Sequence, residues 1–283
     1  MIEQYGIDRL SMGVQSWIEA ETKLLGRPQE VAMVTQAVEQ LKQSKIPEFN
    51  LDLIYGIYQQ TKTTWLYSLE KTIDYQPTEI FLYPLYTRPL TGLSKMQKES
   101  EDNRLFLYRV GRDFLLSNGY VQMSMRCFRK ADAKTISNNY SSPNNGMIGI
   151  GAGARSYTKE MHYSTNYAVS RKAVKDIIHA YSERKDFSTI NYGIILNKEE
   201  QMRRYLIKSL IDGGRLDESV FSKRFGKEVA SLPILEFLFN QKWLEQKDGY
   251  FRLNEKGMEM EDWIGPMLFS KNIKLLMDKF ELN

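Results

Sequence analysis

The chain has 283 residues, of which 42% are apolar, 26% charged and 12% aromatic, and its formal net charge is +4. This composition is typical of a globular protein with a substantial core, and it excludes collagen-like, coiled-coil and disordered chains. No stretch approaches the roughly 20 apolar residues that cross a bilayer, and the first residues lack a signal-peptide layout, so we expect a cytoplasmic protein without a membrane partner. The small, dispersed positive charge is weak evidence for nucleic acid, and we expect no such partner.

One cysteine, Cys127, and two histidines, His162 and His179, limit the chemistry of these residues. A single cysteine excludes an intramolecular disulfide framework and any zinc or iron–sulfur site whose ligands are all cysteines of this chain. We therefore predict no metal ligands and no catalytic residues here. We interpret Cys127 as an inert thiol, His179 as a packed or surface residue, and His162 as a weak candidate ligand.

Short strand-like and longer helix-like patterns alternate in the first 95 residues. They predict strands at 9–15, 49–55 and 80–85, separated by helices at 29–43 and 61–75, the second with Thr61 as its N-cap. Strands joined in this way form a parallel sheet with right-handed crossovers.

Alternate positions of these strands differ in polarity. In the first strand Leu10, Met12 and Val14 alternate with small or polar residues, so we predict one apolar and one polar sheet face. A sheet covered on both faces would be apolar on both, and the pattern therefore favours a barrel-like sheet curved around a polar cavity.

The remaining two thirds contain further predicted elements. In order, they are a helix within 95–117, an extended stretch at 120–128, a loop at 130–145, a close-packed glycine segment at 149–157, a helix at 171–184, a helix at 199–211, helical turns at 220–225 and 232–239, a hairpin at 243–253 and a helix from Glu255 capped by Asn254. The last group resembles a winged helix. We predict three domains: 1–95, 96–195 and 196–283.

Three polar residues are candidates for a binding site. Gln15 and Asp52 lie toward the carboxyl ends of neighbouring predicted strands, and Arg27 lies in the connection after the first. Ligands bind at this mouth in barrel-type α/β folds, and an amide, a guanidinium and a carboxylate suit a zwitterionic or ribose-bearing ligand. A structural Asp–Arg pair at the rim fits the same spacing equally well.

The strings RLSMGVQSW (9–17), LLGR (24–27) and NLDLIYG (50–56) resemble radical SAM enzymes of the oxygen-independent coproporphyrinogen III oxidase type and their heme-chaperone relatives. GIGAGARSY (149–157) and the segment 193–217 extend the resemblance over nearly the whole chain. It implies the α/β fold of the C-terminal half of a partial (β/α) radical SAM barrel, with an α/β extension and a helical winged-helix-like C-terminal domain.

The resemblance also implies a cofactor site. Gln15, Arg27 and Asp52 match positions that contact S-adenosylmethionine (SAM), and Pro84 and Arg155 align with further pocket positions at which the residue types differ. The family's [4Fe–4S] cluster is held by a CxxxCxxC motif in a region expected to precede this chain. We therefore expect the chain alone to be inactive, with a separate N-terminal half as a candidate partner and a tetrapyrrole-like or other small molecule as substrate.

Two other functions stay open at this point. The chain could be a heme- or tetrapyrrole-binding chaperone-like or regulatory module without catalysis, with His162 as its weak candidate ligand. A DNA-binding C-terminal module is the third reading, which the acidic residues near its surface disfavour.

Overall fold

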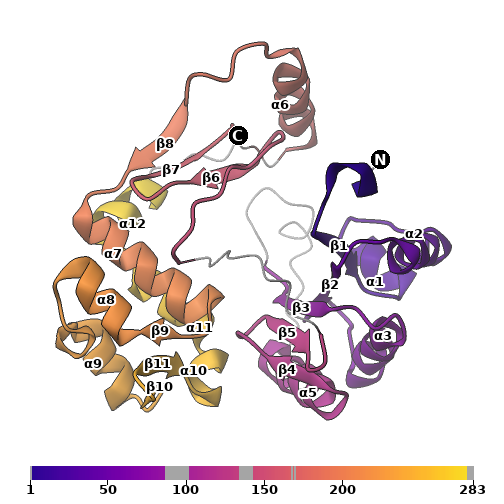
Figure 1. The fold of residues 1–283 in the computed structure, drawn as a ribbon. Helices are drawn as coiled ribbons and strands as arrows, with labels where there is room; N and C mark the ends of the chain where they lie inside the picture. Colours follow the sequence, from indigo (N-terminus) through magenta and orange to yellow (C-terminus); the bar gives the residue numbers. More distant parts are fainter. Residues whose placement is uncertain (1, 87–101, 134–142, 167, 169, 279–283) are drawn as a thin grey trace. The chain divides into compact units, whose positions relative to one another are not determined.

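The computed structural model describes residues 2–86, 102–133, 143–166, 168 and 170–278. The chain is a mixed α/β protein that divides into two compact units, Met1–Asn138 and Asn139–Asn283, each with its own hydrophobic core (Figure 1). The three-domain division remains a prediction. The start of the helix predicted within 95–117 and the centre of the loop predicted at 130–145 lie outside the described residues.

A five-stranded sheet with the order β1–β2–β3–β5–β4 forms the first unit. The strands are β1 (Arg9–Gln15), β2 (Glu48–Tyr55), β3 (Glu79–Pro84), β4 (Tyr120–Gln122) and β5 (Cys127–Lys130). Its helices are η1 (Ile2–Tyr5), α1 (Glu19–Leu24), α2 (Val31–Gln43), α3 (Lys62–Asp74) and α5 (Arg104–Ser117). β1, β2 and β3 pair in parallel, which confirms the predicted parallel sheet.

The stretch predicted as extended over 120–128 is instead a hairpin, and β5 is antiparallel to both β3 and β4. The chain turns between the two strands, where the Met123 amide donates to the Cys127 carbonyl at 2.8 Å. The Ser124 hydroxyl accepts from the Cys127 amide at 3.2 Å and stabilises this turn.

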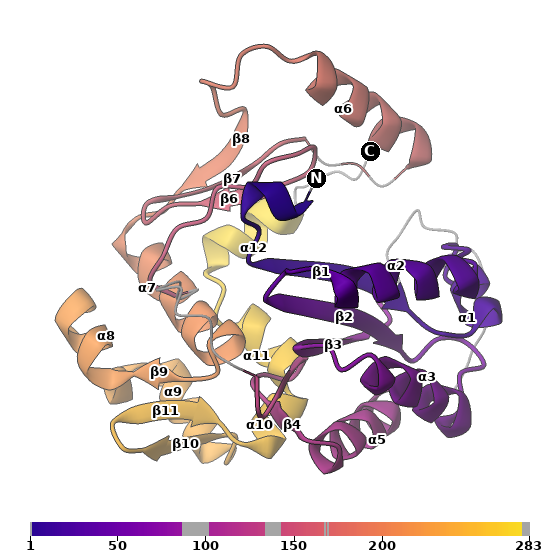
Figure 2. The same ribbon diagram turned by 45° about the vertical axis from the view of Figure 1, so that its right-hand side comes forward.

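The apolar sheet face packs against helices, as the alternation predicts (Figure 2). Trp65 of α3 lies fully buried in this core, and its indole N–H donates to the Leu107 carbonyl at 2.9 Å. A Cβ atom at Gly111 of α5 would lie 2.9 Å from the same indole nitrogen, so the glycine allows α5 to approach α3. Thr61 caps α3 with a capping box, as predicted.

The second unit contains two small antiparallel sheets, ordered β6–β7–β8 and β10–β11–β9. Its strands are β6 (Arg155–Tyr157), β7 (Met161–Ser164), β8 (Tyr192–Ile195), β9 (Leu216–Asp217), β10 (Leu244–Lys247) and β11 (Tyr250–Leu253). Its helices are α6 (Arg171–Glu183), α7 (Lys198–Ile207), the π-helical η2 (Lys208–Asp212), α8 (Glu218–Phe225), η3 (Val229–Ser231), α9 (Pro233–Asn240), α10 (Glu255–Glu259), α11 (Glu261–Met267) and α12 (Lys271–Asp278).

The predicted C-terminal hairpin is confirmed as β10 and β11. Its turn places Asp248 and Gly249 at φ values of 54° and 79°, a left-handed pair that suits these residue types. Asn254 then caps α10, because its side chain accepts from the Gly257 amide. Within the described residues, no helix has the length and apolarity needed to span a membrane.

Candidate functional site

The face of the first sheet opposite the apolar, helix-packed face carries polar side chains in register. Gly13 pairs with Asp52, Asp52 with Phe81, and Phe81 with Cys127, so these positions share one face. We call this the polar sheet face, although it includes one apolar residue, and define it by its register positions and by Gln15, whose amide lies beside Gly13: Arg9, Ser11, Gly13, Gln15, Glu48, Asn50, Asp52, Ile54, Glu79, Phe81, Tyr83, Cys127 and Arg129. It combines hydrogen-bonding groups with two aromatic rings and is the kind of surface that binds a polar ligand.

Asp52 lies near the middle of this face and is partly buried. Its carboxylate accepts from the Asn50 amide at 2.7 Å and from the Ser11 hydroxyl at 3.4 Å. Burial raises the pKa of Asp52 and outweighs these hydrogen bonds and the positive charge of Arg9, which act in the opposite direction. The Oδ1 atom of Asn50 is buried and has no hydrogen-bond partner among the described residues.

Gln15 reaches Asp52 through an irregularity at the end of β1. The strand register shifts between Gly13 and Gln15, and Gln15 has a left-handed φ of 68°. A Cβ atom at Gly13 would lie 2.3 Å from Gln15 Nε2, so the amide occupies the space that a side chain at Gly13 would fill. Because Gly13 is the register partner of Asp52, this bulge places the Gln15 amide next to the Asp52 position.

Arg27 follows α1 and is exposed. Its amide donates to the Thr22 carbonyl at 3.0 Å, and two residues later the Gln29 side chain donates to the Gly13 carbonyl at 3.5 Å. The connection therefore returns to the end of β1, although the Arg27 guanidinium itself extends toward solvent. Within the described residues Arg27 forms no ion pair with Asp52, so the rim pair that fits the same spacing is not found.

The two other predicted pocket residues are Pro84, in the first unit, and Arg155, in the second. Pro84 ends β3 and pairs with Tyr55, which places its buried ring on the helix-covered face opposite Asp52. Arg155 is an exposed residue of β6 in the second unit, where its register partner is Ser164. The structure thus brings Gln15 and Asp52 together, with the segment after Arg27 beside them, and places the Pro84 ring on the opposite face of the sheet. Arg155 belongs to the second unit, and its place in this site stays a prediction.

Sequence reasoning missed the charged network at one end of the polar sheet face. Arg129 pairs with Glu48 at 2.5 Å and with Glu79 at 2.8 Å, and Arg9 pairs with Glu79 at 2.5 Å. The sequence signal for this network was the pair of glutamates, Glu48 and Glu79, at the starts of two neighbouring strands. Their partner came from β5, whose antiparallel pairing was not predicted.

Sequence reasoning also missed Tyr83, which lies on the same face of β3 as Phe81 because the two are two residues apart along the strand. Burial raises the pKa of the Tyr83 hydroxyl, and the nearby Asp52 charge acts in the same direction. The Arg126 guanidinium lies 5.9 Å from the ring centroids of both Tyr83 and Tyr86. The neutral phenol therefore offers a hydrogen-bond donor on the same face as Asp52.

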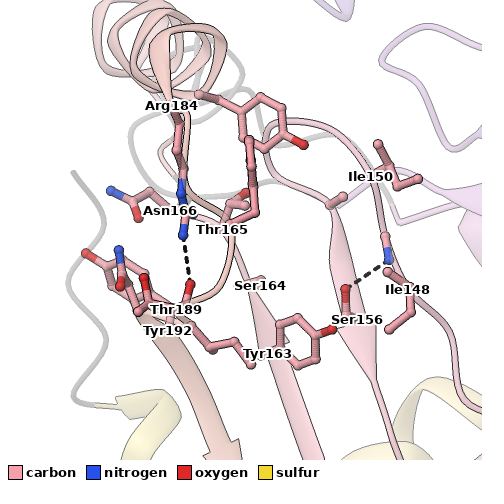
Figure 3. Close-up of a pocket in the computed structure, with 16 residues that line it drawn as sticks. Ile148, Ile150, Ser156, Tyr163, Ser164, Thr165, Asn166, Arg184, Thr189 and Tyr192 are labelled. Atoms are coloured by element: carbon pink, nitrogen blue, oxygen red, sulfur yellow. Dashed lines mark hydrogen bonds between the residues drawn. The ribbon is translucent and has the colours of Figure 1, made fainter.

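The second unit contains a cavity of about 380 Å³ beside α6 (Figure 3). It is lined by the glycine-rich segment, β6 to β8 and the segment after α6, including Ile148, Ser156, Tyr163, Arg184 and Tyr192. The Ser156 hydroxyl accepts from the Gly149 amide at 2.9 Å, and Arg184 donates to the Thr189 carbonyl at 2.7 Å. A Cβ atom at Gly149 would lie 2.4 Å from the Arg155 carbonyl oxygen, which confirms the predicted close backbone approach in this segment.

His162 lies on the opposite face of the same small sheet, because its register partner is Tyr157 whereas Ser156 pairs with Tyr163. Burial lowers the pKa of His162, and the charges of Arg204, Arg155 and Lys208 lower it further. His179 is an exposed residue of α6. Among the described residues, no three His, Cys, Asp or Glu side chains are grouped so that they could hold a metal ion.

No protein-family model matches the chain. It is similar to the oxygen-independent coproporphyrinogen III oxidases of Synechocystis sp. (25% identity over 264 residues, 83% of this chain and 55% of that protein) and Escherichia coli (24% over 274 residues, 90% and 58%). It is also similar to the heme chaperone HemW of Lactococcus lactis (25% over 267 residues, 90% and 67%). The chain thus spans just over half the length of these two oxidases.

A solved structure has the same fold. It is described as coproporphyrinogen III oxidase (HemN) from Escherichia coli, a radical SAM enzyme, and it matches 96% of this chain with a TM-score of 0.74 and 21% identity. The match covers 66% of the solved chain. The protein is therefore a distant homologue of the coproporphyrinogen III oxidase and HemW group, at about 25% identity over most of its length, which confirms the resemblance in the sequence.

Proposed function

We propose that the polar sheet face of the first unit binds SAM and that the chain is part of a radical SAM oxidoreductase of the coproporphyrinogen III oxidase-like group. The observation that carries this proposal is the bulge that places the Gln15 amide next to Asp52. On this proposal the fold is the C-terminal half of a partial (β/α) barrel followed by an α/β extension and a winged-helix-like module. The protein then acts in the cytoplasm on a tetrapyrrole-like or other small molecule.

The residues on this face fit the polar groups of SAM. The two Asp52 oxygens would accept hydrogen bonds from the ribose hydroxyls, and the unpartnered Asn50 Oδ1 supplies a further acceptor beside them. Gln15 and the exposed Arg27 would hold the amino-acid end, with the guanidinium on its carboxylate. Pro84 would contribute through its backbone carbonyl, and a role for Arg155 in this site remains a proposal.

The residues do not fit the [4Fe–4S] cluster. A CxxxCxxC motif supplies three thiolates, and the 283 residues contain one cysteine. When bound, such a cluster supplies the electron for reductive cleavage of SAM and hence for hydrogen abstraction from substrate. We propose that another polypeptide segment provides these ligands. β1 lies at one edge of the sheet, where a further strand could pair with it.

Isothermal titration of SAM tests this proposal. We expect the wild-type chain to bind SAM and Asp52→Ala to bind it at least about tenfold more weakly, since the variant loses charge-assisted hydrogen bonds. Asp74→Ala is the matched control, because Asp74 is an exposed aspartate at the end of α3 in the same unit. Absence of binding by the wild type would remove the site, and equal binding by Asp52→Ala would remove the role of Asp52.

One observation favours heme binding as a second candidate function. His162 has an accessible imidazole whose lowered pKa keeps it neutral near pH 7, the form that ligates iron. A Soret band on heme addition that is lost in His162→Ala and kept in His179→Ala would support this function. A band that survives in both variants would place heme elsewhere.

A further inference from the structure

Five basic side chains of the second unit converge around the Tyr157 ring and its neighbours. We call them the basic cluster: Arg155 of β6, His162 of β7, Arg204 of α7, Lys208 of η2 and Arg224 of α8. The Arg204 guanidinium carbon lies 5.8 Å and the Lys208 ammonium 5.0 Å from the Tyr157 ring centroid, and the His162 ring lies 6.2 Å from it. Five separate elements thus each contribute one basic side chain to this cluster.

Of the basic cluster, only Lys208 pairs with a carboxylate among the residues that the structure describes. Arg204 donates to the carbonyl oxygens of Lys159 at 2.8 Å and Met161 at 3.5 Å, and Arg224 donates to the Asn144 side chain at 3.4 Å. Within the described residues, Arg155, Arg204 and Arg224 form no ion pair, and Lys208 pairs with Asp212 at 2.5 Å. The cluster therefore has three guanidinium charges without an acidic partner.

Such an arrangement destabilises the free protein through mutual repulsion. Burial lowers the pKa of Arg204, and the nearby Arg224 charge lowers it further. Burial likewise lowers the pKa of His162, and the charges of Arg204, Arg155 and Lys208 lower it further. A bound anion would relieve this repulsion, and partly buried guanidinium groups hold oxyanions by bidentate hydrogen bonds.

We propose that the basic cluster binds a small, multiply charged oxyanion of the phosphate or polycarboxylate kind. Three of the groups, those of His162, Arg204 and Lys208, lie around the single ring of Tyr157 rather than along a stripe. This arrangement suits a compact ligand better than the repeating phosphates of a nucleic acid. The site lies on the face of the β6–β8 sheet opposite Ser156 and Tyr163, which line the cavity beside α6, and it does not depend on SAM binding by the first unit.

The two histidines permit a direct test by NMR on the full chain with labelled imidazoles. Sulfate stays doubly charged over the range in which histidine titrates, so pH titrations in sodium sulfate and in sodium chloride of equal ionic strength isolate the effect of a bound dianion. We expect sulfate to raise the pKa of His162 and to leave that of His179 unchanged. Pyrophosphate and citrate, titrated in parallel, distinguish a phosphoryl from a polycarboxylate ligand.

Charge-removing variants locate the effect. Arg155→Gln changes an exposed residue, so its fold should persist, and Arg204→Gln removes the central guanidinium. Each should weaken sulfate binding about tenfold or more and raise the pKa of His162 in chloride. Lys175→Gln is the matched control, since it removes one positive charge four residues before His179 on α6. It should leave sulfate binding at His162 unchanged.

Three outcomes would overturn the proposal. They are equal responses of His162 and His179 to sulfate, an unchanged affinity in both arginine variants, and an equal loss in Lys175→Gln. The first indicates a non-specific effect of sulfate on any histidine, and the others indicate binding elsewhere. Because the test reads the second unit with SAM absent, its failure is distinct from failure of the SAM proposal.

Discussion

Asp52 has a raised pKa because it is partly buried, and its charge is the property that a ribose contact requires. The carboxylate is lost as the pH falls through this raised pKa, whereas an ordinary aspartate would keep its charge to lower pH. We therefore expect SAM affinity to decline, as the pH falls, at a higher pH than it would for an aspartate with an ordinary pKa. Calorimetric titration over a pH series measures this decline. In Asp52→Asn the affinity should be at least about tenfold weaker and independent of pH in that range; a parallel decline in the variant would contradict the assignment.

Gly13 controls where the Gln15 amide lies. Gly13→Ala would place a methyl group 2.3 Å from Gln15 Nε2, and the end of this flexible side chain would have to move. We expect SAM affinity to fall about tenfold while the free energy of unfolding changes by no more than about 1 kcal/mol. Calorimetry and denaturant titration measure the two quantities.

Gly265→Ala is the matched control, because its added Cβ would meet Ile211 at an ordinary 3.4 Å in the second unit. This control should bind SAM like the wild type. If Gly13→Ala also binds normally, the position of the amide does not matter for the site.

Part of this site was predictable from strand parity. Alternation along each strand predicts that Gly13 and Asp52 share the polar face, and they are register partners. Gln15 was assigned to this face by the same alternation, but its amide reaches the face through the bulge after Gly13. The left-handed turn at Gln15 was not predictable, because a positive φ is uncommon for glutamine and depends on the space left by Gly13. The exposure of Arg27 was likewise not predictable, because Arg27 lies in the connection between two helices. In such a connection no periodic pattern indicates which side chains face solvent.

Arg129 joins three strands at the scale of elements. Its guanidinium, with 17% of the side chain exposed, bridges Glu48 of β2 and Glu79 of β3. Arg129→Met would leave the Glu48 carboxylate, 11% exposed, without this ion pair, and Glu79 would keep Arg9. We expect a loss of about 3 kcal/mol in the free energy of unfolding, measured by urea denaturation.

The double variant Arg129→Met/Glu48→Gln separates lost pairing from lost packing. Removing the stranded carboxylate should recover a large part of the stability. If the double variant is as unstable as Arg129→Met alone, the arginine acts through the packing of its aliphatic stem instead.

Elements with strong local signals were predicted well. Thr61 and Asn254 cap helices at the predicted positions, since capping depends on a few neighbouring residues. The β4–β5 hairpin was read as one stretch because its turn, residues 123–126, contains neither glycine nor proline. Helix α1 has six residues and was missed, because so short an element shows little periodicity.

At the scale of the whole molecule, the two proposed sites lie in different compact units with separate cores. Hydrogen exchange followed by mass spectrometry should therefore show protection by SAM at β1 and β2, and protection by sulfate at β6, β7 and α7. Asp52→Ala should lose the first effect and keep the second, and Arg204→Gln should do the reverse. Protection of β6 by SAM in the wild type would bring Arg155 into the SAM site, as the family resemblance implies. Protection by SAM confined to the second unit would contradict the site built on Gln15 and Asp52.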